Sequence, residues 1–236
     1  NNEGCSDAPD AIRKFLYQMY PGSWKCRIAD LGNIKRGHTI QDTYFALTSS
    51  MEALLRRNIV PIIIGGSQDL CFAMYKAYEA MAQIINITAI DNSFDLGEDE
   101  AEINARSYLS KIILTQPNFL FNYTNIGYQT YFVDQDAISL MRKLFFDTVR
   151  LGMAQSSMED IEPTIRNADM VMMDISAVRM SDAPGNLNAS PNGFYGEEAC
   201  QMARYAGFSD KLTSIGFFET NPLYDRCGQT AQLTAQ

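Results

Sequence analysis

The sequence is short of positive charge. Among its 236 residues, 19 are lysine or arginine and 28 are aspartate or glutamate, so the formal net charge at pH 7 is −9. A nucleic-acid backbone and an anionic membrane surface both repel a chain with this excess of negative charge. The composition therefore argues against nucleic acid and membrane lipid as partners.

Long apolar runs and paired cysteines are missing as well. No stretch reaches the ~18 apolar residues that a membrane-spanning helix needs, and no charged-then-apolar secretion signal opens the chain. Five cysteines are scattered without any CxxC pair, namely Cys5, Cys26, Cys71, Cys200 and Cys227. These features predict free thiols and a cytoplasmic protein without membrane insertion.

What the sequence does contain is a regular alternation of strand-like and helix-like segments. The runs 60–66, 84–90 and 169–174 are almost continuously apolar, which is typical of strands buried on both faces of a parallel sheet. Further strand-like runs lie at 26–32, 119–127, 147–151 and 212–218. Helical patterns lie at 8–19, 39–57 (with Thr39 as its N-cap), 69–82, 103–114, 134–144, 157–167 and 194–206. Without a linker or repeat, residues 1–236 are predicted to form a single doubly wound α/β domain, with helices flanking a mainly parallel sheet.

Polar clusters follow three of the predicted strands. They are GGSQD at 65–69, DNSFD at 91–95 and DISAVRMSDAPG at 174–185. Each cluster alone has an ordinary explanation as a turn or a cap. The carboxyl ends of parallel strands meet at one edge of the sheet, where ligands bind in open α/β folds. Together, the clusters therefore predict a binding site at that edge.

These clusters, in this order and spacing, resemble the motifs of the arginase–agmatinase–formimidoylglutamase family of ureohydrolases. The likeness is greatest to a formimidoylglutamase-like member. GGSQD stands where the family has GGDHS, DNSFD where it has DAHxD, and DISAVR where it has DxDxxD. Further matches are Asp30–Asn33, Ala183–Gly185, Gly193–Glu198 and Glu219–Pro222 with Asp225.

The resemblance implies an arginase-like fold and hydrolysis of linear C–N bonds in amidine or formimino groups. It also implies two Mn²⁺ ions at the strand ends and assembly into a homo-oligomer. The family's first strand would precede Asn1 and its last helix would continue beyond Gln236, so we expect the chain to be truncated at both ends.

The sequence departs from the family at the metal ligands. Gln68 and Ser93 stand where the family has histidines, and Ser176 stands where it has an aspartate. The chain has a single histidine, His38, which lies far from the three clusters in a Gly-His-Thr stretch. We expect His38 to be a surface or capping residue. One copy of the chain cannot supply two histidine ligands.

We interpret the retained residues as a remnant metal site, formed by Asp91, Asp95, Asp174 and Gln68. Their oxygen atoms are suitable ligands for a hard cation. We therefore expect either no metal or one weakly held divalent ion (Mg²⁺, Ca²⁺ or Mn²⁺), and we do not expect a binuclear manganese pair.

Two charged residues have a candidate role beside this site. Two carboxylates ~4 Å apart repel each other by about 4 kcal/mol at an effective dielectric near 20. Arg179 stands at the third-aspartate position of the DxDxxD motif, and we hypothesise that it offsets part of this charge; the alternative is an exposed loop arginine. Glu198 matches the family's substrate-side glutamate, and its alternative is an ordinary glutamate in the first turn of a helix.

Two classes of function remain open. The first is a catalytically impaired or non-catalytic protein that binds a small amidine-like ligand or a protein partner. The second is an active metal-dependent hydrolase of linear C–N bonds, such as that of formimidoylglutamate. No residue is assigned as catalytic. Nucleotide binding at Gly65-Gly66 is disfavoured because neither a Walker lysine nor a GxGxxG pattern follows.

Overall fold

A parallel β-sheet organises the computed structural model, which describes residues 2–23, 25–97 and 103–236. In this part of the chain, six strands lie in the order β1-β6-β5-β2-β3-β4, and every neighbouring pair is parallel. The strands are β1 (Ile62–Ile64), β2 (Ile85–Ile90), β3 (Leu120–Tyr128), β4 (Asp147–Arg150), β5 (Met170–Asp174) and β6 (Ser214–Phe218). The prediction of a single α/β domain with a mainly parallel sheet is confirmed.

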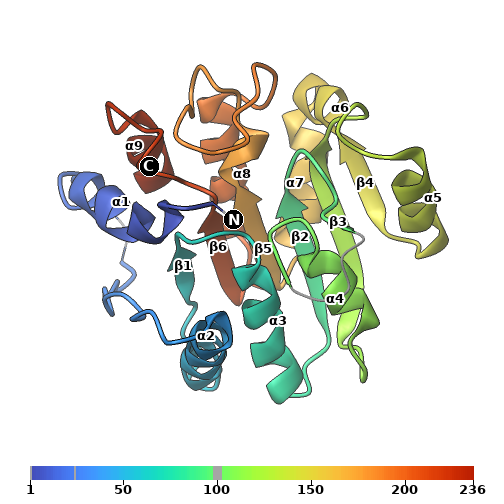
Figure 1. Ribbon diagram of the computed structural model, residues 1–236, viewed down its shortest axis with the longest axis horizontal. Helices are drawn as coiled ribbons and strands as arrows, with labels where there is room; N and C mark the ends of the chain where they lie inside the picture. The colour runs from blue at the N-terminus through green and yellow to red at the C-terminus, as the bar shows by residue number, and fades with distance from the viewer. Residues whose placement is uncertain (1, 24, 98–102) are drawn as a thin grey trace.

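Helices cover both faces of this sheet (Figure 1). They are α1 (Ala8–Leu16), α2 (Ile40–Leu55), α3 (Leu70–Ala80), α4 (Tyr108–Leu114), α5 (Gln135–Lys143), α6 (Leu151–Ser156), α7 (Met158–Arg166), α8 (Gly196–Gly207) and α9 (Gln229–Ala235). One core cluster joins α2, α3, α4 and α5 to one face, and a second joins α6, α7 and α8 to the other. Helices α1 and α9 pack against each other and share a small third cluster with Ile64 of β1.

The central strand β5 shows why the apolar runs form this sheet. Alternate side chains of a strand point to opposite faces. Met170 and Met172 therefore join the core on one side, and Val171 and Met173 join the core on the other. All four are buried, as the continuous apolar run predicts.

Helix α2 begins where the sequence predicts. The Thr39 hydroxyl accepts a hydrogen bond from the Asp42 amide, and the Asp42 carboxylate accepts one from the Thr39 amide, so the two residues form a capping box. His38 precedes this cap and is exposed, in agreement with its predicted surface position.

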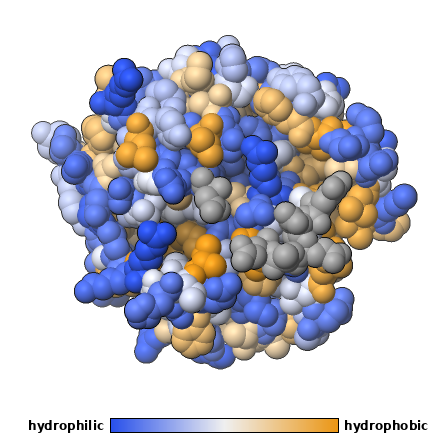
Figure 2. Space-filling model, viewed as in Figure 1, coloured by the Kyte–Doolittle hydropathy of each residue, from blue (hydrophilic) through white to orange (hydrophobic). Residues whose placement is uncertain are grey.

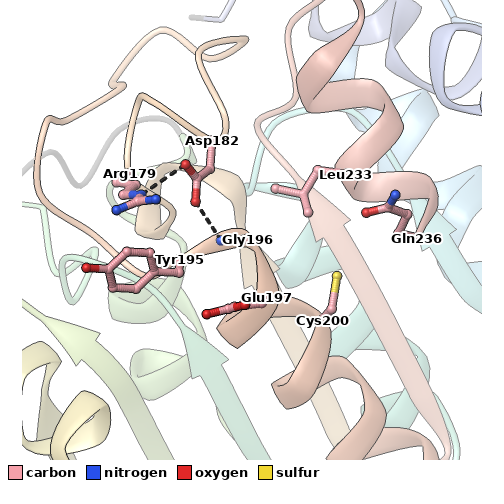
Figure 3. A pocket seen from close by; sticks show the side chains of 8 residues that line it. All are labelled: Arg179, Asp182, Tyr195, Gly196, Glu197, Cys200, Leu233 and Gln236. Atoms are coloured by element: carbon pink, nitrogen blue, oxygen red, sulfur yellow. Dashed lines mark hydrogen bonds and ion pairs between the residues drawn. The ribbon is translucent and has the colours of Figure 1, made fainter.

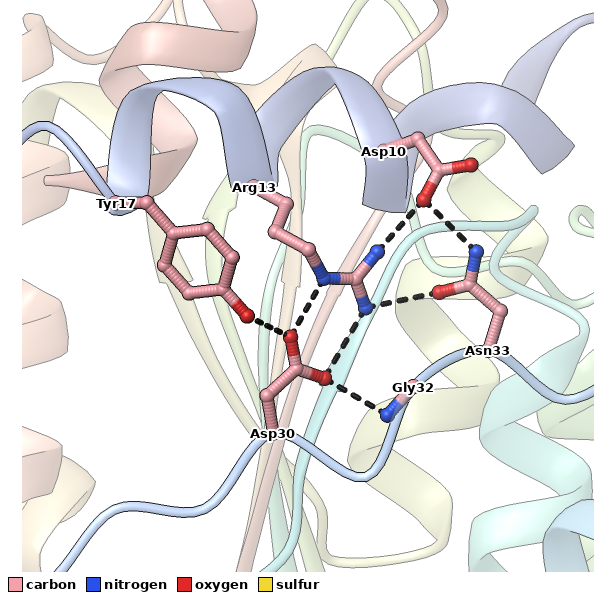
Figure 4. A network of polar contacts seen from close by, with 6 residues as sticks. All are labelled: Asp10, Arg13, Tyr17, Asp30, Gly32 and Asn33. Carbon is pink, nitrogen blue, oxygen red and sulfur yellow. Dashed lines mark hydrogen bonds and ion pairs between the residues drawn. The ribbon is translucent and has the colours of Figure 1, made fainter.

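The predicted strand at 26–32 is absent from the structure. These residues are exposed and have no strand assignment, and Ile28 and Leu31 are 83% and 75% exposed. Side chains rather than a backbone ladder hold the segment to α1 (Figure 4). Arg13 Nε pairs with Asp30 Oδ2 at 2.6 Å, Tyr17 also donates to this carboxylate, and the Gly32 amide donates to Asp30 Oδ1 at 2.8 Å. An apolar run becomes a strand only where a neighbouring strand takes up its backbone hydrogen bonds. No described strand lies beside residues 26–32.

On the face of the molecule that is turned to the viewer in Figure 1, hydrophobic and hydrophilic residues are mixed. Figure 2 shows hydrophobic residues in small groups separated by hydrophilic ones on this face. Among the described helices, none is long and apolar enough to cross a membrane.

Burial of β5 on both faces generates a stability prediction. Replacement of the fully buried Met172 by alanine should lower the free energy of unfolding by about 2–5 kcal/mol, because the change removes packing and leaves a cavity. Met153 on α6 is 64% exposed, so Met153→Ala is the matched control and should change stability by less than about 0.5 kcal/mol. Urea titrations measure both values, and equal effects would contradict the burial of this strand.

Candidate metal and substrate site

The candidate site lies where the order of the strands reverses. From β2 the chain continues to β3 and β4 on one side, and from β5 it continues to β6 on the other. Asp91 directly follows β2, and Asp174 is the last residue of β5. The carboxyl ends of two such neighbouring strands form the crevice in which open α/β sheets bind ligands. Three strand-end clusters predicted to meet therefore do come together here.

Hydrogen bonds connect the predicted site residues. Gln68 Nε2 donates to Asp91 Oδ2 at 2.6 Å, and the Ser93 amide donates to Asp91 Oδ1 at 3.0 Å. Ser93 Oγ donates to Asp95 Oδ1 at 2.8 Å. On the neighbouring strand, the Ser176 amide donates to Asp174 Oδ1 at 2.6 Å. We call Asp91, Asp95 and Asp174 the carboxylate cluster.

Burial and mutual repulsion disfavour the charged form of this cluster. Burial has the largest effect and raises the pKa of all three aspartates, well above the ordinary value for Asp95 and Asp174. The charge of Asp91 raises the pKa of both Asp95 and Asp174 further. None of the three forms an ion pair among the described residues. The cluster therefore needs a cation or protons to offset its charge.

Asp95 is the member with a free acceptor. No described donor reaches its buried Oδ2 atom. Its backbone adopts φ 52°, a left-handed conformation that is uncommon outside glycine and recurs at functional sites. Asp69, which is also buried, differs because Tyr44 and Ser67 both donate to its carboxylate. Asp69 is thus satisfied by neighbouring hydroxyls, whereas Asp95 lies against the Asp91 carboxylate, with which it forms a hydrogen bond only when one of the two is protonated.

The side-chain oxygens of the site are suitable ligands for a cation, but the side chains are not arranged around one. Carboxylate oxygens suit Mn²⁺ and Mg²⁺, and the unpartnered Asp95 Oδ2 is available. Gln68 donates through its nitrogen to Asp91, so its amide would have to rotate before its oxygen could bind a metal. Within the described residues, no three Asp, Glu, His or Cys side chains already form a metal-binding group. Metal binding at this edge therefore requires local rearrangement of side chains.

Glu219 belongs to the site, although sequence reasoning gave it no role. It directly follows β6. Its buried carboxylate accepts hydrogen bonds from the backbone amide of Gln68 (2.7 Å) and from Asn2 Nδ2 (2.6 Å). Burial raises its pKa, and its charge in turn raises the pKa of Asp174. The signal was available in the sequence, because a carboxylate ends the apolar run of β6 as it ends those of β2 and β5.

Arg179 and Glu198 have partners outside the carboxylate cluster, and Figure 3 shows those of Arg179. Arg179 Nε pairs with Asp182 Oδ1 at 2.9 Å, and its guanidinium lies 3.7 Å from the centre of the Tyr195 ring. This placement differs from the expected one beside the cluster, because Asp182 and Tyr195 provide nearer charge and stacking. Glu198 Oε2 accepts from the Tyr195 amide and from Gln155 Nε2, so it caps the start of α8.

Fold and site together define an α/β protein with a buried carboxylate cluster at the switch point of a parallel sheet. A sequence model of the Arginase family matches residues 1–236, so the chain belongs to that family. The formimidoylglutamase of Staphylococcus carnosus is 27% identical over 98% of this chain and 77% of that protein. The solved formimidoylglutamase of Bacillus subtilis has a TM-score of 0.88 at 20% identity, covering 100% of this chain and 79% of its own. The Trypanosoma cruzi formiminoglutamase with Mn²⁺₂ has a TM-score of 0.89 at 17% identity, covering 99% and 86%.

The comparisons correct the expectation about manganese. Several T. cruzi formiminoglutamase structures contain a pair of manganese ions, and the S. carnosus and S. aureus relatives are formimidoylglutamases. Our expectation that no binuclear manganese site occurs is therefore wrong in this family context. It rested on the two replaced histidines and on Ser176 at an aspartate position, whereas the carboxylates Asp91, Asp95 and Asp174 are the part of the donor set that remains.

The raised pKa values predict how the metal-free protein responds to pH. A carboxyl group whose pKa is higher in the folded state contributes stability that is complete below its unfolded pKa of ~4 and is lost as pH rises through the folded pKa. The metal-free protein should therefore have a lower Tm at pH 8 than at pH 5, and Asp95→Asn should reduce this difference. Differential scanning calorimetry measures both, with the exposed Asp160→Asn as the control. A Tm that rises from pH 5 to pH 8 would contradict the effect of burial.

Proposed function

We propose that this protein is a metal-dependent hydrolase of a linear C–N bond, similar to the formimidoylglutamases. The observation that carries the proposal is the buried, unpartnered Oδ2 atom of Asp95 beside Asp91 and Asp174. A buried oxygen acceptor in a cluster of like charges is costly unless a cation or proton meets it. Membership of the Arginase family, together with the manganese pair in T. cruzi formiminoglutamase structures, supports a metal as that partner.

The residues of the chain would have separate roles in this reaction. Asp91, Asp95 and Asp174 would hold the manganese, which when bound lowers the pKa of water and so provides a nucleophile at neutral pH. Glu219 lies at the same edge of the sheet, linked to Gln68, and its carboxylate would bind and orient the cationic amidine group of the substrate. We assign this role to Glu219 rather than Glu198, because Glu219 lies close enough to the carboxylate cluster for its charge to raise the pKa of Asp174, whereas Glu198 caps the start of α8.

A second candidate function is binding of a small amidine-like ligand without turnover. The specific observation that favours it is the set of neutral side chains at three ligand positions. Ser93 donates to Asp95, Ser176 Oγ accepts from Asn92 Nδ2, and Gln68 donates to Asp91. Gln68 and Ser93 hydrogen-bond to the carboxylates, and none of the three side chains contributes charge to a metal site.

Assays of turnover separate the two candidates. We expect release of formamide or ammonia from N-formimidoylglutamate when the protein is loaded with Mn²⁺. Asp174→Asn should lower kcat/KM by at least ~100-fold, equivalent to about 2.7 kcal/mol of transition-state stabilisation. Glu219→Gln should have an effect of similar size, because the change removes the charge that faces the amidine. The matched control is Glu197→Gln, an exposed glutamate in the first turn of α8.

Calorimetric titration with the same substrate completes this test. Binding without turnover would support the second candidate, and turnover that survives Asp174→Asn would contradict the hydrolase site. A protein that neither binds nor hydrolyses amidines would contradict both candidates.

A Mn²⁺ titration tests the metal itself. Ligands that bind only the folded state raise Tm by mass action, so Mn²⁺ should stabilise the protein most at pH 8, where the cluster repels itself most. Asp95→Asn should abolish most of this stabilisation. Stabilisation that is unchanged in Asp95→Asn would place the metal elsewhere.

A further inference from the structure

The beginning of the described chain contacts the candidate site at two points. Asn2 Nδ2 donates to Glu219 Oε2 at 2.6 Å and to the Glu219 carbonyl oxygen at 3.4 Å. The carbonyl oxygen of Cys5 accepts a hydrogen bond from the amide of Gly66, just after β1, at 3.2 Å. Neither Asn2 nor Cys5 belongs to the three polar clusters at the strand ends. Residues 2–5 are therefore an additional part of this site.

The carboxylate of Glu219 is held by one neutral donor on each oxygen. Oε1 accepts from the backbone amide of Gln68 at 2.7 Å, and Oε2 accepts from Asn2. The side chain is buried and forms no ion pair with a described residue. Donors on both oxygens fix the plane of the carboxylate, and each oxygen keeps a further lone pair for a ligand. Asn2 is thus one of the two groups that set the orientation of this carboxylate.

A second asparagine fixes the orientation of the Asn2 amide. Asn221 Nδ2 donates to Asn2 Oδ1 and to the carbonyl oxygen of Glu3 (2.6 Å). Because Asn2 Oδ1 already accepts this hydrogen bond, the Nδ2 group is the one that faces Glu219. Asn221 is fully buried, and its Oδ1 accepts from the Leu223 amide at 3.0 Å. The two asparagines therefore form a directed chain of hydrogen bonds that ends at the carboxylate.

Close packing of the first described residues depends on Gly4. Its backbone has φ 97°, a left-handed conformation that glycine adopts without strain. A Cβ atom at this position would lie 2.6 Å from Asn221 Oδ1 and 2.6 Å from Leu223 Cδ1, too close for either atom. The backbone of Glu219 is also left-handed, with φ 66°. The contact between Asn2 and Glu219 thus rests on two backbone conformations that most residues avoid.

We propose that Asn2 is a positioning residue for the amidine group of the substrate and that it acts through Glu219. Its Nδ2 group holds the carboxylate in the orientation in which both oxygens accept N–H groups from a planar amidinium. Bidentate recognition of a planar cation requires both oxygens in the plane of the ligand. The inference rests on the proposed function, because that function assigns the amidine to Glu219. Asn2 itself contacts no reacting atom.

A double-mutant cycle in the Mn²⁺-loaded protein tests the proposal. Asn2→Ala should lower kcat/KM for N-formimidoylglutamate about 10-fold, mainly through a higher KM, because the carboxylate loses one of its two donors. In the Glu219→Gln protein, the same change should have no further effect, since Asn2 acts only through the carboxylate. Asn2→Asp keeps the shape of the side chain but places a second carboxylate against Glu219. It should therefore lower kcat/KM more than Asn2→Ala does.

Calorimetry with acetamidinium chloride, at constant ionic strength, gives a measurement that does not need turnover. Asn2→Ala should weaken binding of this cation about 10-fold, and the Glu219→Gln background should again remove the difference. Glu3→Gln is the matched control, because Glu3 is the next residue of the same segment and is exposed. Its kinetics and its affinity for acetamidinium should stay within about 2-fold of the unmodified protein.

The possible results separate this inference from the proposed function. An unmodified protein that neither binds acetamidinium nor releases product would overturn the role of Glu219 and the inference with it. Binding that falls in Glu219→Gln but is unchanged in Asn2→Ala would overturn the positioning role and leave the hydrolase proposal intact. An equal loss from Asn2→Ala in both backgrounds would show that Asn2 only stabilises the fold, and this result would also overturn the inference.

Discussion

The burial of like charges at one point of the sheet is the constraint on which the site depends. Asp91 and Asp174 lie there because β2 and β5 are neighbours whose connections lead in opposite directions. The strands bring the carboxylates together because both faces of the sheet are packed with apolar side chains. The favourable burial of the core thus holds together groups that would separate in water. Protons or a bound cation would relieve this repulsion.

The residues that surround the carboxylate cluster donate hydrogen bonds to it. Gln68, Ser93 and the Ser176 amide all donate hydrogen bonds to carboxylate oxygens. Neutral donors of this kind stabilise the charged form of the carboxylates. Glu219 increases the negative charge, and its hydrogen bond from the Gln68 amide connects the ends of β1 and β6 to that of β2. The charge of Glu219 also raises the pKa of Asp174 at the end of β5, so four strand ends act as one electrostatic unit.

The sequence predicts the buried parts of this protein better than its edges. Continuous apolar runs identify β2 and β5 because burial on both faces leaves no room for polar alternation, and the Thr39 cap follows from local chemistry alone. The segment 26–32 has the same composition as a strand, yet strand formation depends on a neighbour that local sequence does not specify. The position of Arg179 could not be predicted for a similar reason. Asp182, three residues later, and Tyr195 compete for its guanidinium, and only the folded loop shows which partner lies nearest.

The attachment of residues 26–33 to α1 has a consequence for the dynamics of the chain. The described links from Asp30 and Asn33 to α1 run through Arg13, Tyr17 and Asp10, with no backbone ladder between them. An attachment of this kind can open without breaking the sheet. The backbone amide hydrogens of residues 26–33 should therefore exchange with solvent much faster than those of β5. Its strength also depends on ionic strength, because exposed charges are screened within ~8 Å at physiological salt. Salt therefore weakens the attachment of residues 26–33 to α1 while leaving the hydrophobic core unchanged.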